Sequence, residues 1–247
     1  MFSVDSHKGK YYVVFGTPLE EAVKSCIQDT DFLVIDKCVY DKYPIFHRLI
    51  DSKRIYILRA GEETKTLQTC QELISILISS GFKRNHKLVA VGGGITQDIT
   101  SFTASVLFRG IGWKFFPTTL LAQADSCIGS KTSINFSNTK NLLGSFHPPE
   151  QIICCTEFLK TLPRNDIKSG IGEMLHYYIY ADSSLLEDMT REYNKLVENP
   201  CELMGRYIEE SLSIKREMIQ RDEFDKGERR VFNYGHTFGH AIEALSN

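Results

Sequence analysis

The first half of this chain alternates short apolar runs with amphipathic runs, and this alternation restricts the folds open to it. Apolar runs typical of strands occupy residues 11–15, 31–35, 54–58, 87–91 and 113–116. Segments with helical spacing of apolar residues separate or follow them, at 18–27, 41–50, 66–80 and 98–108. Strands that alternate with helices form a parallel sheet with helices on both faces, and such sheets bind ligands at the carboxyl ends of their strands.

The second half has a different pattern. After Pro163 the spacing is helical almost throughout, over 166–180, 184–197, 202–219 and from 233 onward. The sequence therefore predicts an α/β domain over 1–162 and a helical domain over 163–247, with the active site between them.

Composition narrows the classes of function. A formal net charge of -2 argues against general nucleic-acid binding, which needs a basic surface. No run of eighteen apolar residues is present, and the first ten residues contain no apolar signal core. The seven cysteines lack the spacing of a disulfide framework. We expect a cytoplasmic protein with free thiols that binds neither nucleic acid nor membrane.

A glycine triplet marks one strand end. Gly92, Gly93 and Gly94 follow a predicted strand and precede a helix, so the bare backbone could approach a phosphate at the helix N-terminus. The spacing matches neither Gly-x-Gly-x-x-Gly nor the Walker pattern, and a tight turn is the alternative. Asp98, expected in the first helical turn, could bind a sugar hydroxyl or favour the helix dipole.

Polar residues follow the fifth predicted strand at the same edge. Thr118 and Thr119 could line a cofactor cleft or cap a helix. The nearby polar residues are Arg109, Asp125, Lys131, Lys140 and Asn141. The three cations among them suit an anionic ligand, and a solvated surface is the alternative for each lysine.

Two pairs of residues have the spacing of a metal site. His236 and His240 are four apart, and Glu173 and His176 are three apart on the predicted 166–180 helix. Side chains at these spacings share a helix face. Zinc accepts such oxygen and nitrogen ligands, although a single histidine is more often a packed or surface residue.

Taken together, segments of the chain resemble those of the dehydroquinate synthase family, among the sugar phosphate cyclases. They occur in family order from about residue 60 to the end of the chain. The segments are GEETK at 61–65, GGGITQD at 92–98, FRGI at 108–111, PTTLLA at 117–122, DSCIGSKT at 125–132, KN at 140–141, SGIGE at 169–173 and NYGHTFGHAIE at 233–243.

The resemblance implies a Rossmann-like NAD-binding α/β domain followed by an all-helical metal-binding domain. It implies an NAD- and metal-dependent carbon–oxygen lyase of the shikimate pathway, which cyclises a seven-carbon keto acid phosphate with loss of phosphate during aromatic amino acid biosynthesis. The implied metal is zinc or cobalt, and the implied assembly is a homodimer.

Roles of individual residues follow from the resemblance by position. The implied NAD contacts are Asp36, Glu62, Lys65, Gly93, Gly94, Asp98, Thr118, Thr119, Lys131 and Lys140. The implied metal ligands are Glu173 and His236. The implied substrate contacts are Arg109, Asp125, Lys131, Asn141, Lys215, Arg229, Asn233 and His240, with His240 also a candidate for proton transfer.

Several positions depart from the family pattern. His176 replaces a substrate-contacting lysine, and Asp225 replaces a glutamate. Ser130 and Ser101 replace glycines and are expected to crowd a loop. The sequence ends at Asn247 without the family's second histidine ligand, so we expect a fragment, or compensation by His240 or His176.

Three alternatives stay open at this point. One is a sugar phosphate cyclase acting on a sedoheptulose or glucose phosphate, which His176 favours. Another is a metal-dependent alcohol dehydrogenase of the glycerol dehydrogenase kind. The third is a non-catalytic NAD-binding remnant.

Overall fold

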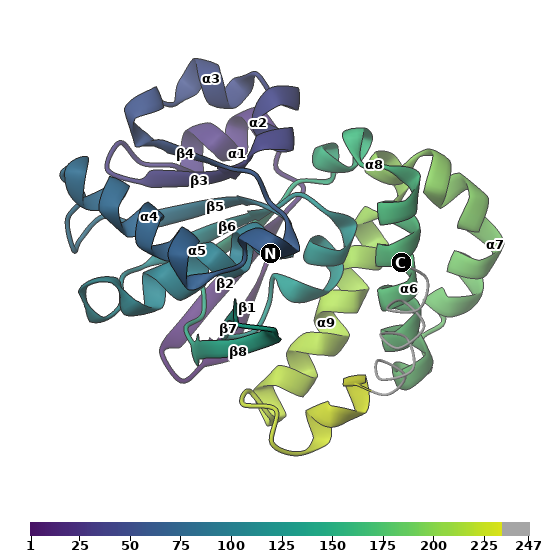
Figure 1. Ribbon diagram of the computed structural model, residues 1–247. Coiled ribbons are helices and arrows are strands. Elements are labelled where there is room, and N and C mark those ends of the chain that lie inside the picture. The colour runs from purple at the N-terminus through teal and green to yellow at the C-terminus, as the bar shows by residue number, and fades with distance from the viewer. Residues whose placement is uncertain (234–247) are drawn as a thin grey trace.

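The computed structural model describes residues 1–233, the last of them by its backbone alone. Its sheet and its helical part lie side by side (Figure 1). One seven-stranded sheet has the order β1-β2-β9-β6-β5-β3-β4. The strands are β1 (Phe2–Ser6), β2 (Gly9–Phe15), β3 (Phe32–Asp36), β4 (Ile55–Leu58), β5 (Leu88–Gly92), β6 (Trp113–Pro117) and β9 (Gln151–Cys154). All pairings are parallel except the β1–β2 hairpin, which confirms the predicted parallel sheet.

The central strands are buried on both sides because helices cover both faces, and they are apolar apart from Lys114 of β6. Every residue of β5 and of β6 is buried. Helices α1 (Leu19–Cys26), α2 (Lys37–Lys42) and α3 (Ile45–Leu49) form one core with one sheet face. Helices α4 (Leu67–Ser79) and α5 (Gly94–Val106) bury the opposite face.

The remaining helices follow Pro163. They are α6 (Arg164–Ala181), α7 (Leu185–Glu198), α8 (Pro200–Leu203) and α9 (Gly205–Arg221). Their buried residues, such as Ile171 and Leu212, belong to the same hydrophobic cluster as the α4–α5 face of the sheet. The predicted order of a parallel sheet followed by helices is thus confirmed, while the division at residue 162 stays a prediction because one core spans both parts.

The structure corrects several expected elements. Strands β1 and β9 were not expected, nor was the separate hairpin of β7 (Lys131–Phe136) and β8 (Thr139–Phe146). The helix expected over 41–50 is divided into α2 and α3 around Pro44, which disfavours a helical conformation for the residue before it. The helix expected over 202–219 is likewise two helices, α8 and α9.

Two expectations from composition can be compared with the structure. All seven cysteines are free thiols, as predicted. Within residues 1–233, no helix has both the length and the apolar character needed to cross a membrane. The helix predicted from residue 233 onward lies outside the described residues, apart from the 3₁₀ turn that ends at Asn233.

Candidate active site

A cavity of about 610 Å³ opens at the carboxyl ends of β3, β5 and β6. The register aligns these ends, because Ile35 pairs with Val91 and Gly92 pairs with Pro117. The α6 N-terminal residues Asp166 and Ser169 close its far side. The predicted cofactor contacts that line it are Asp36, Glu62, Lys65, Gly93, Gly94, Asp98, Thr118 and Thr119.

The glycine triplet lets α5 begin directly at this cavity. A Cβ at Gly93 would lie 2.9 Å from Thr119 Cγ2, whereas Gly94 faces open space. Helix α5 begins at Gly94, so its first amides and positive dipole end lie at the cavity and suit a phosphate. The expected start at residue 98 is therefore wrong. Asp98 belongs to the second turn of α5, where the helix dipole stabilises a carboxylate only weakly.

Asp98 instead belongs to a network that closes one wall of the cavity. Lys65 Nζ lies 2.6 Å from Asp98 Oδ2 and donates to Asn141 Oδ1 at 2.5 Å. Burial raises the pKa of Asp98 above its ordinary value, although the Lys65 ammonium opposes this rise. Asn141 lies on β8 and has a left-handed backbone conformation, with φ 56°. Its side chain thus belongs to the cavity network and not to the Asp125 cluster.

Two further acidic residues lie at strand ends or turns beside the cavity. Asp36 ends β3 and caps α2, with its carboxylate accepting from the Cys38 amide at 2.6 Å. Glu62 begins the 3₁₀ turn Glu62–Thr64 and accepts from Asn135 Nδ2 at 2.8 Å. Local hydrogen bonds therefore orient both carboxylates before any ligand binds.

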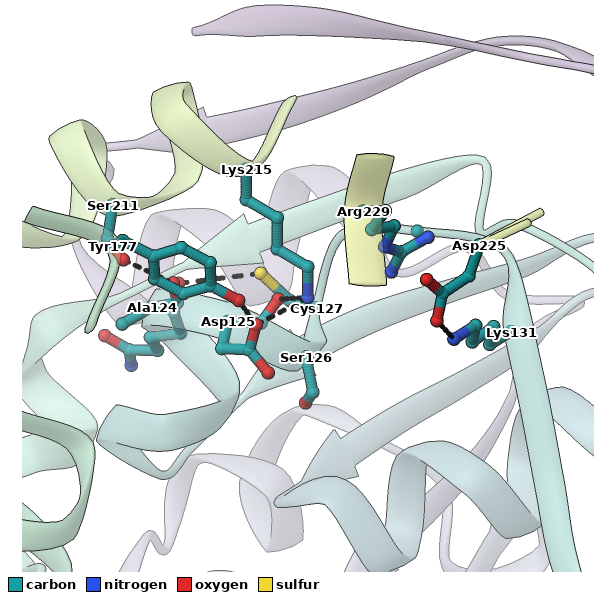
Figure 2. A network of polar contacts seen from close by, with 12 residues as sticks. Ala124, Asp125, Ser126, Cys127, Lys131, Tyr177, Ser211, Lys215, Asp225 and Arg229 are labelled. Carbon is teal, nitrogen blue, oxygen red and sulfur yellow. Dashed lines mark hydrogen bonds and ion pairs between the residues drawn. The ribbon is translucent and has the colours of Figure 1, made fainter. Parts of the chain in front are cut away.

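A second polar cluster centres on Asp125, as Figure 2 shows. Asp125 lies in the π-helical turn Ala122–Ser126, a type of irregularity frequent at functional sites. Lys215 of α9 donates to Asp125 Oδ1 at 2.6 Å and to its carbonyl at 2.7 Å. The Tyr177 hydroxyl of α6 donates to the same carboxylate oxygen. Burial alone would raise the pKa of Asp125, but the Lys215 ammonium and the Tyr177 hydroxyl outweigh it and hold this pKa below its ordinary value.

Close packing of α6 and α9 on the π-helical turn produces this convergence. A Cβ on Gly170 would lie 2.5 Å from Leu120 Cγ and 2.9 Å from the Leu121 amide, so only glycine lets α6 approach this closely. Ser211 of α9 donates to the Ala124 carbonyl at 2.9 Å. Helices α6 and α9 are thereby brought to the carboxylate of the π-helical turn, although the three segments are distant in sequence.

Positive charge gathers beside Asp125. Arg229 is 8% exposed and contributes to lowering the pKa of Asp125. Lys131 of β7 pairs with Asp225, and Figure 2 shows this pair beyond Arg229. Lys131, Arg229 and Lys215 therefore place three cations around one region, which suits a ligand with more than one anionic group.

The metal-ligand residues predicted on α6 share one face. Glu173 and His176 are half-buried, and Phe232 packs edge-on against His176 at 6.0 Å between ring centroids. Phe232 thus brings the beginning of the 233–243 segment to this face. His236 and His240 lie outside the described residues, and within residues 1–233 no group of three or more His, Cys, Asp or Glu could hold a metal.

Two predicted contacts lie away from these clusters. Arg109 is exposed beyond the C-terminus of α5, a helix of 13 residues that places it about 20 Å from the glycine triplet. The expectation that it shares an edge with the other cations is therefore wrong within one chain. Lys140 is exposed on β8 and does not line the cavity.

The predicted crowding by serines is also wrong for Ser101. It lies inside α5, where its hydroxyl donates to the Asp98 carbonyl at 3.2 Å. Tyr177 was missed as a site residue. A signal for it existed, because it lies four residues after Glu173 and so shares the face of α6 that carries the predicted metal ligand.

Comparisons with known proteins agree with this architecture. The family model for the 3-dehydroquinate synthase N-terminal part matches residues 55–169, and that for the C-terminal part matches residues 170–247. The chain is 36% identical to a 3-dehydroquinate synthase of Clostridium tetani (strain Massachusetts / E88) over 247 residues. That match covers 98% of this chain but only 65% of the relative's length.

Two solved structures are similar to most of the chain. One is 2-epi-5-epi-valiolone synthase from Streptomyces hygroscopicus subsp. jinggangensis 5008 with NAD+ and Zn2+ bound, with 26% identity and a TM-score of 0.84 over 94% of this chain and 68% of that one. The other is 2-deoxy-scyllo-inosose synthase complexed with carbaglucose-6-phosphate, NAD+ and Co2+, with 30% identity and a TM-score of 0.81 over 98% and 68%.

The chain has the architecture of the sugar phosphate cyclases. This architecture consists of a parallel sheet, a cavity at the carboxyl edge of the sheet, and a helical part that follows. Both halves of the sequence match one family within that class. The chain belongs to the 3-dehydroquinate synthase family.

Proposed function

We propose that this chain acts as a 3-dehydroquinate synthase, a carbon–oxygen lyase that cyclises a seven-carbon keto acid phosphate with elimination of phosphate. The observation that carries the proposal is the cluster of Asp125, Lys215 and Arg229, with Lys131 nearby, next to a cavity of dinucleotide size. A substrate with a carboxylate and a phosphate needs several cations in one place, and a binder of dinucleotide alone does not.

We assign NAD to the cavity. The bare Gly93 backbone and the N-terminus of α5 suit the pyrophosphate, and Asp36 suits an adenosine ribose hydroxyl. Bound NAD supplies reversible removal of hydride from a ring hydroxyl. Lys65, Asp98, Thr118 and Thr119 would position the nicotinamide end, while Lys131 and Lys140, which do not line the cavity, remain weaker candidates.

We assign Glu173 and His236 as ligands of a zinc or cobalt ion. The half-buried Glu173 lies near Tyr177, which packs on Phe232 at 4.7 Å, so the following histidine segment begins at the correct face of α6. A divalent ion supplies Lewis-acid polarisation of the substrate oxygens.

The chain's own groups bind the substrate and manage its protons. Lys215 and Arg229 would hold the carboxylate and phosphate, with Lys131 released from Asp225 to help. Asp125 remains ionised and can accept a hydrogen bond from a substrate hydroxyl through Oδ2, because Oδ1 is occupied by Lys215 and Tyr177. His240 and Asn233 complete the proposed set of substrate contacts. Asn141, which binds Lys65, and Arg109, at the other end of α5, are weaker candidates.

His176 favours a second candidate. A histidine in place of the family's lysine removes a permanent cation from the substrate region, and this change suits a less anionic sugar phosphate. The structural similarity to two cyclases with other product names supports the same alternative, a sugar phosphate cyclase acting on a sedoheptulose or glucose phosphate.

Release of phosphate from the seven-carbon keto acid phosphate tests the proposal, with catalytic NAD and added zinc. Both the 247-residue chain and a form extended by any coding sequence beyond Asn247 should be assayed. Release that depends on NAD and metal supports 3-dehydroquinate synthase. No release by either form, with NAD still bound, would reject this substrate, and release from a sedoheptulose or glucose phosphate would select the second candidate.

We further propose a cytoplasmic homodimer. The free thiols support a reducing compartment, and the dimer rests on the family resemblance. Light scattering coupled to size exclusion tests the dimer, and a monomeric mass would reject it.

A further inference from the structure

The N-terminal hairpin of β1 and β2 precedes the segment matched by the family models, which begins at residue 55. It lies at the edge of the sheet, and its turn reaches the loop that follows α9. This loop contains Asp225 and Arg229, two residues of the polar cluster described above.

The hairpin turn binds one residue of that loop through two hydrogen bonds. The His7 amide donates to Glu223 Oε2 at 2.9 Å, and His7 Nδ1 lies 2.9 Å from Glu223 Oε1. Because an ionised carboxylate only accepts, Nδ1 carries the hydrogen. Partial burial would raise the pKa of Glu223, but the two His7 hydrogen bonds, together with those from Ser130 and Ser6, outweigh it and hold this pKa below its ordinary value.

The same loop residue contacts Arg229 on its other side. The Glu223 carbonyl accepts from Arg229 Nη1 at 3.0 Å. The neighbouring Asp222 carboxylate accepts from the amides of Lys226, Gly227 and Arg229 at 2.9, 2.7 and 3.2 Å. These internal bonds tie residues 222–229 together, so fixing Glu223 fixes the Arg229 guanidinium as well.

A second contact joins the hairpin to the segment before Lys131. The buried Tyr11 hydroxyl accepts from the Gly129 amide at 2.8 Å. Gly129 has φ 112°, a conformation open to glycine, and it lies two residues before Lys131. The loop and the hairpin are further joined by Phe224, whose ring lies 5.4 Å from His7.

We propose that the N-terminal hairpin, residues 2–15, is a positioning element for the anion-binding part of the candidate site. His7 positions Arg229 through Glu223, and Tyr11 positions the approach to Lys131 through Gly129. The hairpin itself supplies no group that contacts the ligand. The identity of the anion rests on the proposed function, whereas the positioning does not.

The principal test compares His7→Ala, which removes the ring donor, with His7→Asn, whose amide can replace it. Lys10→Ala is the matched control, because Lys10 lies on the same hairpin with 61% of its side chain exposed, and within residues 1–233 its ion pair is with the exposed Asp5. Four quantities are measured: hydrogen exchange of amides 222–230, KM for the seven-carbon keto acid phosphate, Kd of inorganic phosphate in the presence of NAD, and Kd of NAD.

For His7→Ala we expect faster exchange of 222–230 and a rise in KM and in phosphate Kd of roughly five- to tenfold, the size of one typical net hydrogen-bond contribution. The Kd of NAD should stay unchanged, since the hairpin does not line that cavity. His7→Asn should recover most of the loss, and Lys10→Ala should behave as the wild type.

Unchanged exchange of 222–230 in His7→Ala would overturn the inference. So would equal weakening of NAD binding with faster exchange throughout, which would indicate a role in folding alone. If the wild type releases no phosphate from the substrate, the proposed function fails, and exchange with phosphate titration still decides the positioning. A wild type that binds no phosphate would overturn the anion site and this inference together.

Discussion

Tyr177 acts together with Lys215 to keep Asp125 ionised. Its hydroxyl is buried, and burial followed by the Asp125 charge raises the pKa of Tyr177 above its ordinary value, so it stays a donor. It shares Asp125 Oδ1 with Lys215 and thereby helps to keep the carboxylate ionised and oriented. The local sequence indicates that Tyr177 shares a helix face with Glu173. It does not indicate that Tyr177 binds Asp125, which lies 52 positions away.

Tyr177→Phe should lower stability by about 1.5–3 kcal/mol at neutral pH, because a hydrogen bond to a charged group is lost without a change of shape. Asp125 has a folded-state pKa below its unfolded value, so its stabilisation is present at neutral pH and lost as pH falls through the folded pKa. In the variant that pKa rises toward the unfolded value, so the acid-side loss should be smaller and should be complete at a higher pH.

Denaturant titrations across pH 3–7 measure this effect. Tyr180→Phe is the control, since Tyr180 is 43% exposed on the same helix and also packs on Phe232. An acid limb that coincides for Tyr177→Phe and the wild type would contradict the assigned role.

At the scale of elements, the approach of α6 to the π-helical turn decides whether the two parts of the site meet. Helix α6 carries Asp166 and Ser169 at the cavity, then Glu173 and Tyr177 near Asp125. Gly170, which packs against Leu120, sets this approach.

Gly170→Ala should destabilise the protein by about 1–3 kcal/mol, the usual cost of overpacking, because its Cβ meets the Leu121 backbone. Gly172→Ala on the same helix meets nothing within 4 Å and should stabilise by up to about 1 kcal/mol, through helix propensity. Thermal and urea unfolding compare the pair. Equal effects of the two substitutions would show that close packing does not set the position of α6.

The glycine loop gives a second prediction at this scale. Gly93→Ala places a Cβ 2.9 Å from Thr119 Cγ2 and moves the N-terminus of α5 away from a phosphate. We expect NAD affinity to fall by roughly tenfold, about 1.4 kcal/mol, within the range for overpacking at a fixed backbone. Isothermal titration with NAD measures it, with Gly172→Ala again as the control. Unchanged affinity would remove Gly93 from the proposed cofactor site.

At the scale of the whole molecule, one hydrophobic core extends from the sheet into the helical part. Leu88 and Ala90 of β5 belong to the same cluster as Tyr178 of α6 and Leu212 of α9. A two-domain division would normally give each part its own core. The candidate site therefore lies where the sheet meets the helical part, and the hydrophobic core runs through the same junction.

Calorimetry should accordingly show one unfolding transition, with calorimetric and van't Hoff enthalpies that agree. The isolated 1–162 segment should fail to fold cooperatively, because it would expose the apolar surface that α6 and α9 cover. Two separate transitions in the intact chain would instead support independent domains with a boundary near residue 162.

Local pattern was sufficient for the central elements of this protein. The strands β3 and β5 carry apolar runs, β6 is apolar apart from the buried Lys114, the glycine triplet precedes a helix, and α6 follows Pro163. Each of these signals lies within one short segment, where backbone geometry and side-chain period act directly. The four-residue β9 and the exposed β8 have too little apolar pattern to be recognised in this way.

Only the tertiary structure decided which polar groups meet. The sequence already contained Asp125, Lys215, Lys65 and Asn141 as candidates, but it did not show that Asn141 joins Lys65 or that Tyr177 joins Asp125. Such contacts connect segments tens of residues apart, and they form because helix packing and sheet register bring those segments together. Local periodicity reports which face of an element is buried, whereas the partner on the other side depends on the whole fold.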